Sequence, residues 1–234
     1  MSILFFAAVS LLSAPDVVPA EIEYPESALR GGKSAASLID VVVDPNGKAV
    51  RCDILRTFGD DNLAAEVCSI QKSWKYKPAI SQTGEPTFGI FRTLVKFALL
   101  GTPDGDYVDK LVTVPDISLA VTARKLPIRQ SRQTLDPVQL LVAHPAITFD
   151  VAALPGIDGT YLDVTVVVEA NADGIVISCE SASDPSGEEK DAAYNAVACK
   201  QLNGSNVGKL AGQDDRPTGF VRLLPVRFEV PSTQ

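Results

Sequence analysis

The sequence is poor in positive charge. Its 234 residues include 21 lysines and arginines against 29 aspartates and glutamates, which gives a net charge of −8 and a pI near 4.7. An acidic chain without a basic block is repelled by nucleic acid and by anionic membrane surfaces. We therefore expect neither of these as a binding partner.

Motifs that carry catalysis are also missing. The single histidine, His144, precedes Pro145 and has no nucleophile motif near it. The sequence contains no G-x-S-x-G elbow, no P-loop, no G-x-G-x-x-G and no H-E-x-x-H. Acidic pairs such as Asp60-Asp61 fall at expected helix starts or turns, where capping explains them. We expect a protein that is not an enzyme and that has no cofactor and no metal site.

No hydrophobic run is long enough to cross a membrane. The chain starts with an apolar run, Met1 to Ala14. Twelve residues of such a run span about 18 Å as a helix, against about 30 Å for the hydrocarbon core. This length is typical of a secretory signal, and Val18-Pro19-Ala20 has the small residues of a cleavage site. We expect residues 1–20 to be a signal peptide. Because no Lys or Arg precedes the run, the alternative is a buried N-terminal strand or helix of a cytosolic protein.

The four cysteines form two pairs, and none lies in a C-x-x-C pattern. Fifteen residues separate Cys52 from Cys68 and nineteen separate Cys179 from Cys199, which is not a zinc-ligand spacing. The first cysteine of each pair lies on one face of a strand-like run, and the second lies on the apolar side of a helix-like run. We predict Cys52–Cys68 and Cys179–Cys199 disulfides, hence an oxidising compartment. Buried free thiols are the alternative.

The cysteine pairs belong to a longer internal repeat. Gly47 and Cys52 recur 127 residues later, and a second set of residues recurs 131 residues later. That set is Cys68, Pro86, Thr87 and Phe97, matching Cys199, Pro217, Thr218 and Phe228. A period this long is typical of two copies of a small domain. We expect one domain at 21–100, a connector at 101–144 and a degenerate second domain at 145–234.

Hydrophobic periodicity in the first copy predicts the order α-β-β-α-β. The expected elements are a short helix at 24–31, strands at 38–43 and 49–56 joined by Asp44-Pro45-Asn46-Gly47, a helix from Asp60 or Asp61 to about Ser73, and a long strand at 87–99. This order predicts an α+β fold, in which each copy is a three-stranded antiparallel sheet packed on helices.

The connector contains the one locally basic stretch, with Arg124, Lys125, Arg129 and Arg132. We interpret these charges as a solvated surface; an anionic-ligand site is the alternative. The connector is too long for a plain linker, so we expect it to pack against one or both domains.

Four short motifs occur in the first copy in a characteristic order. They are Tyr24-Pro25, the turn Val43-Asp44-Pro45-Asn46-Gly47, the helix exit Trp74-Lys75-Tyr76-Lys77-Pro78-Ala79, and Gly84-Glu85-Pro86 before the long strand that ends at Phe97. In these motifs residues 22–99 resemble the TonB C-terminal domain family. The second copy, at about 145–231, resembles the family weakly, because Leu202-Asn203-Gly204 replaces the aromatic helix exit.

The resemblance implies a periplasmic module that binds an extended segment of an outer-membrane transporter, such as a TonB-dependent receptor, or of another envelope protein, by adding it to the sheet as a strand. The implied partner-binding strand has Phe88, Ile90, Arg92, Leu94 and Lys96 along it. One alternative is a TonB-type energy transducer in transmembrane transport, on the periplasmic side of the inner membrane. The other is a structural or scaffolding periplasmic protein with no open strand edge.

The second copy differs at one position of its last strand. The 131-residue offset places Pro225 where the first copy has Leu94. Proline lacks the N–H group that an added strand would use. We therefore predict that partner binding belongs to the first copy.

Overall fold

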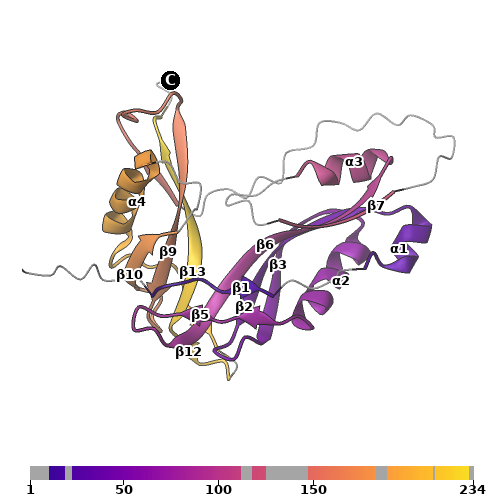
Figure 1. The fold of residues 1–234 in the computed structure, drawn as a ribbon, viewed down its shortest axis with the longest axis horizontal. Helices are drawn as coiled ribbons and strands as arrows, with labels where there is room; N and C mark the ends of the chain where they lie inside the picture. The colour runs from indigo at the N-terminus through magenta and orange to yellow at the C-terminus, as the bar shows by residue number, and fades with distance from the viewer. Residues whose placement is uncertain are drawn as a thin grey trace, which may run out of the picture.

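One sheet of nine strands runs through the whole protein (Figure 1). The computed structural model describes residues 11–18, 23–111, 118–124, 147–182, 189–212 and 214–231. The strand order is β10-β9-β13-β6-β2-β3, with β5 and β7 pairing with β6, and β8 pairing with β13. The mixed α+β class expected from the sequence is therefore present.

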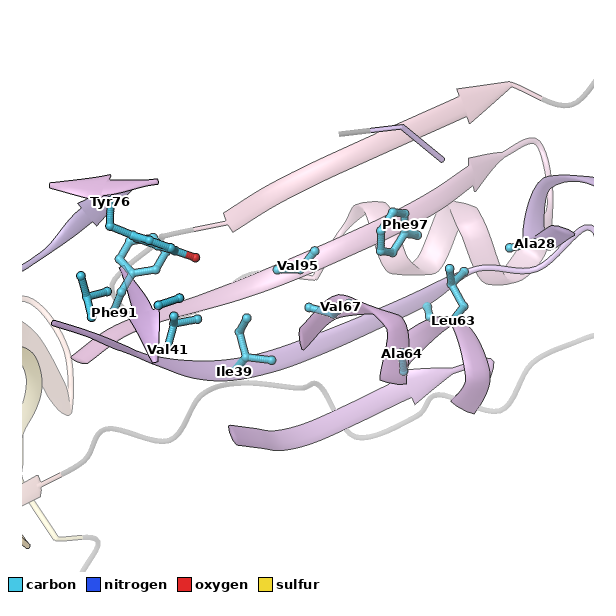
Figure 2. Close-up of a cluster of buried hydrophobic side chains, with 13 residues drawn as sticks. Ala28, Ile39, Val41, Leu63, Ala64, Val67, Tyr76, Phe91, Val95 and Phe97 are labelled. Carbon is cyan, nitrogen blue, oxygen red and sulfur yellow. The ribbon is translucent and has the colours of Figure 1, made fainter. Parts of the chain in front are cut away.

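The N-terminal unit has the predicted order α-β-β-α-β, with two short strands, β4 and β5, inserted before the last strand. Its elements are α1 (Glu26–Gly31), β2 (Ala35–Val43), β3 (Ala49–Gly59), α2 (Asp61–Lys72), β4 (Tyr76–Lys77), β5 (Ala79–Ile80) and β6 (Pro86–Leu100). Asp60 caps α2, accepting a hydrogen bond from Leu63 N at 3.0 Å. The buried side of α2 packs on the alternate apolar residues of β2 and β6 (Figure 2).

The C-terminal unit repeats the strand-strand-helix-strand order. Its elements are β9 (Tyr161–Ala170), β10 (Val176–Ser181), α4 (Glu189–Leu202), β11 (Leu210–Ala211), β12 (Pro217–Thr218) and β13 (Phe220–Glu229). Its core is formed by Ala198 and Leu202 of α4 against the alternate valines of β9 and the even-numbered apolar residues of β13. The two units therefore bury equivalent faces of their sheets under a helix.

The repeated turn glycines are required by backbone geometry. Gly47 and Gly174 have φ angles of +77° and +79°, which L side chains rarely adopt. A Cβ atom on either glycine would lie 2.2 Å from a backbone oxygen, that of Tyr76 or of Gly208. The recurrence of glycine in the sequence thus reflects the same turn used twice.

The two units share one sheet, whereas the sequence analysis predicted a separate three-stranded sheet for each. β13 joins β6 in a short parallel pairing, in which Phe220, Val221 and Arg222 lie opposite Phe88, Gly89 and Ile90. Phe220 packs with Val42, Phe88 and Ile90 on the face of the N-terminal unit opposite α2. Because Phe220 belongs to the α4 side of β13, α2 and α4 cover opposite faces of the continuous sheet. Periodicity within each unit carries no information about such pairing between them.

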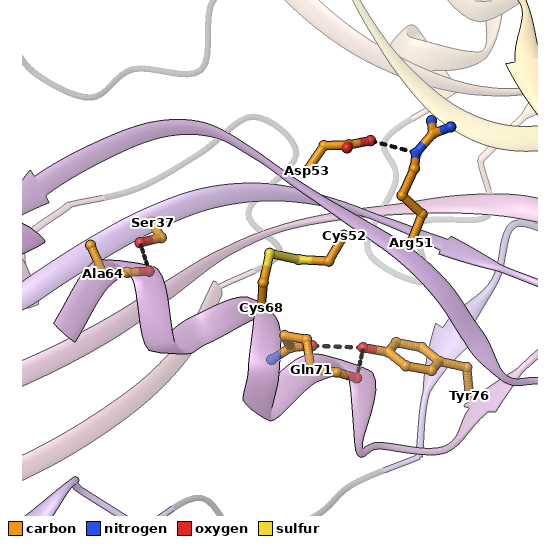
Figure 3. Close-up of a disulfide and its surroundings, with 8 residues drawn as sticks. All are labelled: Ser37, Arg51, Cys52, Asp53, Ala64, Cys68, Gln71 and Tyr76. Carbon is orange, nitrogen blue, oxygen red and sulfur yellow. Dashed lines mark hydrogen bonds and ion pairs between the residues drawn. A yellow bond between two sulfur atoms is a disulfide. The ribbon is translucent and has the colours of Figure 1, made fainter. Parts of the chain in front are cut away.

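Both predicted disulfides are present. Cys52 of β3 is bonded to Cys68 of α2 (Figure 3). Cys179 of β10 is bonded to Cys199 of α4, and no cysteine is free. The Cα–Cα distances are 5.6 Å and 5.2 Å. Each bond ties the helix of its unit to the strand at the outer edge of the sheet.

Part of the connector packs on the N-terminal unit. α3 (Pro103–Asp109) follows β6, and its Val108, together with Leu111, lies against Leu94 and Ala98. β7 (Ser118–Arg124) pairs with β6, and β8 (Ile147–Asp150) pairs with β13. Lys125, Arg129, Arg132 and His144 lie outside the described residues.

Part of the predicted signal peptide is packed into the fold. β1 (Asp16–Val17) pairs with β4, and Ser13 exchanges two backbone hydrogen bonds with Ile80, of 3.1 and 2.9 Å. Leu12 is buried against Ala79 and Val221, so it contacts both units. Residues 1–10 and the predicted cleavage site after Val18 lie outside the described residues.

The disulfides predict a measurable loss of stability. Replacing Cys52 by Ser should lower the free energy of unfolding by about 2–5 kcal/mol, because the unfolded chain regains the freedom that the bond removes. Denaturant unfolding of the variant and the wild type measures this. Thiol titration of the denatured, unreduced wild type should find no free thiol, and two or more reactive thiols would contradict the pairing.

Two adjacent leucines test whether the N-terminal segment is part of the folded protein. Leu12 is 8% exposed, whereas Leu11 is 53% exposed. Leu12→Ala should lower the unfolding free energy by about 2–4 kcal/mol, and Leu11→Ala by less than about 0.5 kcal/mol. Equal stability of both variants, with an N-terminus at Glu21 in the purified protein, would show instead that the segment is removed.

Candidate functional site

The outer edge of β6, the side away from β2, is the candidate binding edge. Leu99 N donates to Ser34 Oγ at 3.1 Å, which shows that the backbone groups of this residue point toward β2. Because backbone groups alternate along a strand, the even-numbered residues of β6 direct N–H and C=O to the outer edge. These are the predicted residues Phe88, Ile90, Arg92, Leu94 and Lys96.

The outer edge is occupied by other strands of the same chain. β13 lies along residues 88–90 and β7 along residues 94–100, both parallel to β6. Neither of these strands pairs with residues 91–93. Figure 1 shows why: β6 and β13 lie together near their starts and then diverge. The row of free backbone groups expected along 87–99 is therefore absent at 88–90 and 94–100, and partner binding by this strand stays a prediction.

The last strand of the C-terminal unit carries an added strand in the same way. β8 lies parallel to β13 from Val226 to Glu229, on the side away from β9. Ala182 N donates to Thr165 O at 3.2 Å, so Thr165 points its backbone groups toward β10. Pro225, opposite Thr165, therefore turns its nitrogen to the outer edge of β13. The donor that Pro225 lacks is one that an added strand would use.

The side chains of the predicted binding residues are engaged within the protein. Phe88 and Ile90 pack against Phe220, and Leu94 packs under α3. Lys96 is buried and donates from Nζ to the carbonyl oxygens of Asp109 and Leu111, both at 3.0 Å. A partner at this edge would thus be held by backbone hydrogen bonds more than by these side chains.

An ion cluster that the sequence analysis missed lies where the two units join. Arg92 of β6 donates two hydrogen bonds of 2.7 Å to the carboxylate of Asp40 on β2. Arg222 of β13 comes within 3.9 Å of the same carboxylate. Arg222 occupies the position where the N-terminal unit has Phe91, so an arginine in a core position was the signal available in the sequence.

The cluster has more positive than negative charge. Arg222 is 9% exposed, and burial lowers the pKa of its guanidinium; Asp40 raises this pKa and Arg92 lowers it. Arg222 also makes a weak hydrogen bond, from Nε to Leu223 O at 3.4 Å. Because one carboxylate serves two guanidinium groups, Asp40 is the group on which both arginines depend.

The strands at the two ends of the nine-stranded sheet carry exposed apolar side chains. β3 and β10 end the strand order on either side. Ile54 and Leu55 on β3 are 40% and 42% exposed, and Ile177 on β10 is 54% exposed. Edges of this kind are further places where a strand could be added.

Neither a metal site nor a membrane helix is found in the described part of the chain. There, no group of three or more His, Cys, Asp or Glu side chains could hold a metal ion. The helices of the same residues are too short or too polar to cross a membrane. The geometry of this part is that of a sheet edge that pairs with strands.

The ion cluster predicts unequal effects of two matched substitutions. Asp40→Ala should lower the unfolding free energy by about 2–4 kcal/mol, because it leaves two arginines without their carboxylate. Asp163→Ala is the control, since Asp163 and Arg227 form the same two 2.7 Å bonds away from the junction. Urea unfolding followed by circular dichroism should show the larger loss for Asp40→Ala. Equal losses would mean that Arg222 does not depend on Asp40.

Residues 20–99 match the family described as Gram-negative bacterial TonB protein C-terminal. No curated protein and no solved structure matches the chain. The matched region ends within β6, so α3, β7 and the C-terminal unit lie outside it. This family indicates a role in protein–protein interaction on the periplasmic side of the envelope. Residues 20–99 of this chain are therefore similar to the TonB C-terminal family, as their motifs predicted.

Proposed function

We propose that this protein is a periplasmic binding module that takes an extended segment of another envelope protein as an added strand on the outer edge of β6. A TonB-dependent outer-membrane receptor is the partner that the family favours. The C-terminal unit, as a degenerate second copy of the domain, then serves as a structural companion.

The observation that carries this proposal is the pairing of β7 with β6. β7 lies outside the matched region, so the TonB-type domain taken alone leaves residues 94–100 of β6 with unpaired backbone groups. Here a seven-residue strand covers them in parallel. Unpaired groups on an edge favour strand addition, because a partner strand supplies the missing hydrogen bonds.

The assignment of binding to the N-terminal unit follows from the two edges. Leu94 and Pro225 occupy equivalent positions, and both direct the backbone nitrogen outward. Leu94 offers an N–H donor and Pro225 does not. The outer edge of β6 is therefore the better acceptor of a strand.

One observation favours a second function, a scaffold with no open edge. β6 is paired on both sides over most of its length, by β2 on one side and by β13 and β7 on the other. In that case β7 is a permanent part of the sheet, and the protein contacts its partners through its surface rather than through a strand edge.

Photocrosslinking from single positions in the cell envelope separates these functions. A photoreactive residue in place of Leu100, at the end of the outer edge of β6, should give adducts with a partner protein. The same residue in place of Leu55 on β3 is the control and should give none. Adducts from Leu55 alone would move the binding edge to β3 and overturn the proposal, and no adduct from either position would favour the scaffold.

A further inference from the structure

β7 is the strand of this edge that is held least firmly. Among the described strands it pairs with β6 alone, whereas β6, β2, β9 and β13 each have neighbours on both sides. An edge strand can leave without breaking any pairing but its own. The sheet of the N-terminal unit, its disulfide and the β6–β13 junction do not pass through β7.

The helix that precedes β7 has its own anchor. Val108 and Leu111 are fully buried against β2 and β6. Lys96 Nζ donates to the carbonyl of Asp109 at the end of α3 and to that of Leu111, two residues beyond it. Departure of β7 would therefore leave α3 in place, and the change would be confined to the outer edge of β6.

The edge under β7 specifies the kind of strand that fits it. Leu94 to Leu99 are all buried, since α2 and its cluster cover one face of β6 while α3 covers the other. A strand beside a sheet covered on both faces is favoured when it is apolar or small. The sequence of β7, Ser118-Leu119-Ala120-Val121-Thr122-Ala123-Arg124, carries no charge before its last residue.

We propose that β7 is an internal competitor for the partner's place on β6. The partner segment is an uncharged, parallel, extended stretch of about seven residues that displaces β7, and the protein binds only while β7 is released. This proposal rests on the proposed function and adds the polarity and chemistry of the segment and the step that regulates its binding.

The direction of the backbone groups provides a matched pair of variants. Even-numbered residues of β6 face β7, and Lys96 lies opposite Ala120. In a parallel ladder the backbone groups of Lys96 form hydrogen bonds with the two residues that flank Ala120. Leu119, Val121 and Ala123 therefore direct their N–H groups to β6. Val121→Pro removes one of these donors. Thr122→Pro is the control, because the N–H group of Thr122 points away from β6 and its loss leaves the β6–β7 hydrogen bonds in place.

Binding of a defined peptide tests the displacement. The probe is a fluorescent, end-blocked peptide with the sequence of residues 118–124, added to the full chain with both disulfides intact. Fluorescence anisotropy should show Val121→Pro binding it at least about tenfold more tightly than the wild type, because release of β7 raises the population of the open edge. Thr122→Pro should bind like the wild type. A folded Val121→Pro that binds no more tightly than the wild type would overturn the proposal.

Hydrogen exchange of the wild type gives a test that needs no variant. The amides of Leu119, Val121 and Ala123 should exchange at least about a hundredfold faster than those of Val95 and Phe97, which face β2. Equal protection would show that β7 does not open and would contradict the proposal.

The crosslinking experiment separates this proposal from the function on which it rests. Adducts from Leu100 should be stronger in Val121→Pro than in the wild type. Equal adducts in both proteins would support the binding function and would contradict the proposal that β7 competes with the partner. If Val121→Pro binds the peptide but gives no envelope adduct, the release of β7 is supported and the proposed class of partner is contradicted.

Discussion

The hydrogen-bonding demand of one strand edge organises this protein. β6 is the last strand of its domain, and its even-numbered residues turn N–H and C=O groups away from β2. Such groups require partners, from another strand or from solvent. β13 supplies them at 88–90 and β7 at 94–100. The joining of the two units and the placement of the connector both follow from this demand.

The junction of the units is held by two kinds of contact on opposite faces of the sheet. One face has Phe220 among the apolar residues of β2 and β6, with the Asp40–Arg92–Arg222 cluster beside it. The other has Leu12 and Ala79 against Val221. The pairing of backbones is only three residues long, so these side chains decide whether the sheet is continuous. A buried arginine that shares its carboxylate also disfavours any other pairing of β13.

Much of the N-terminal unit could be predicted because the causes are local. The alternation of apolar residues gave β2 and β6, the Asp60 cap gave the start of α2, and Gly47 gave the turn that a positive φ requires. The disulfides could be predicted because Cys52 and Cys68 lie on elements that face one core. The junction could not, since the pairing of Val221 with Gly89 joins residues far apart in the sequence.

The sequence by itself determined the main elements of the N-terminal unit and the cysteine pairs, because periodicity, caps and turns act within a few residues. Only the tertiary structure decided what meets the outer edge of β6. Backbone N–H and C=O groups are the same in every strand, so the edge alone does not select β13, β7 or a partner. That selection depends on the twist that separates β6 from β13 and on the burial of Arg222 beside Asp40.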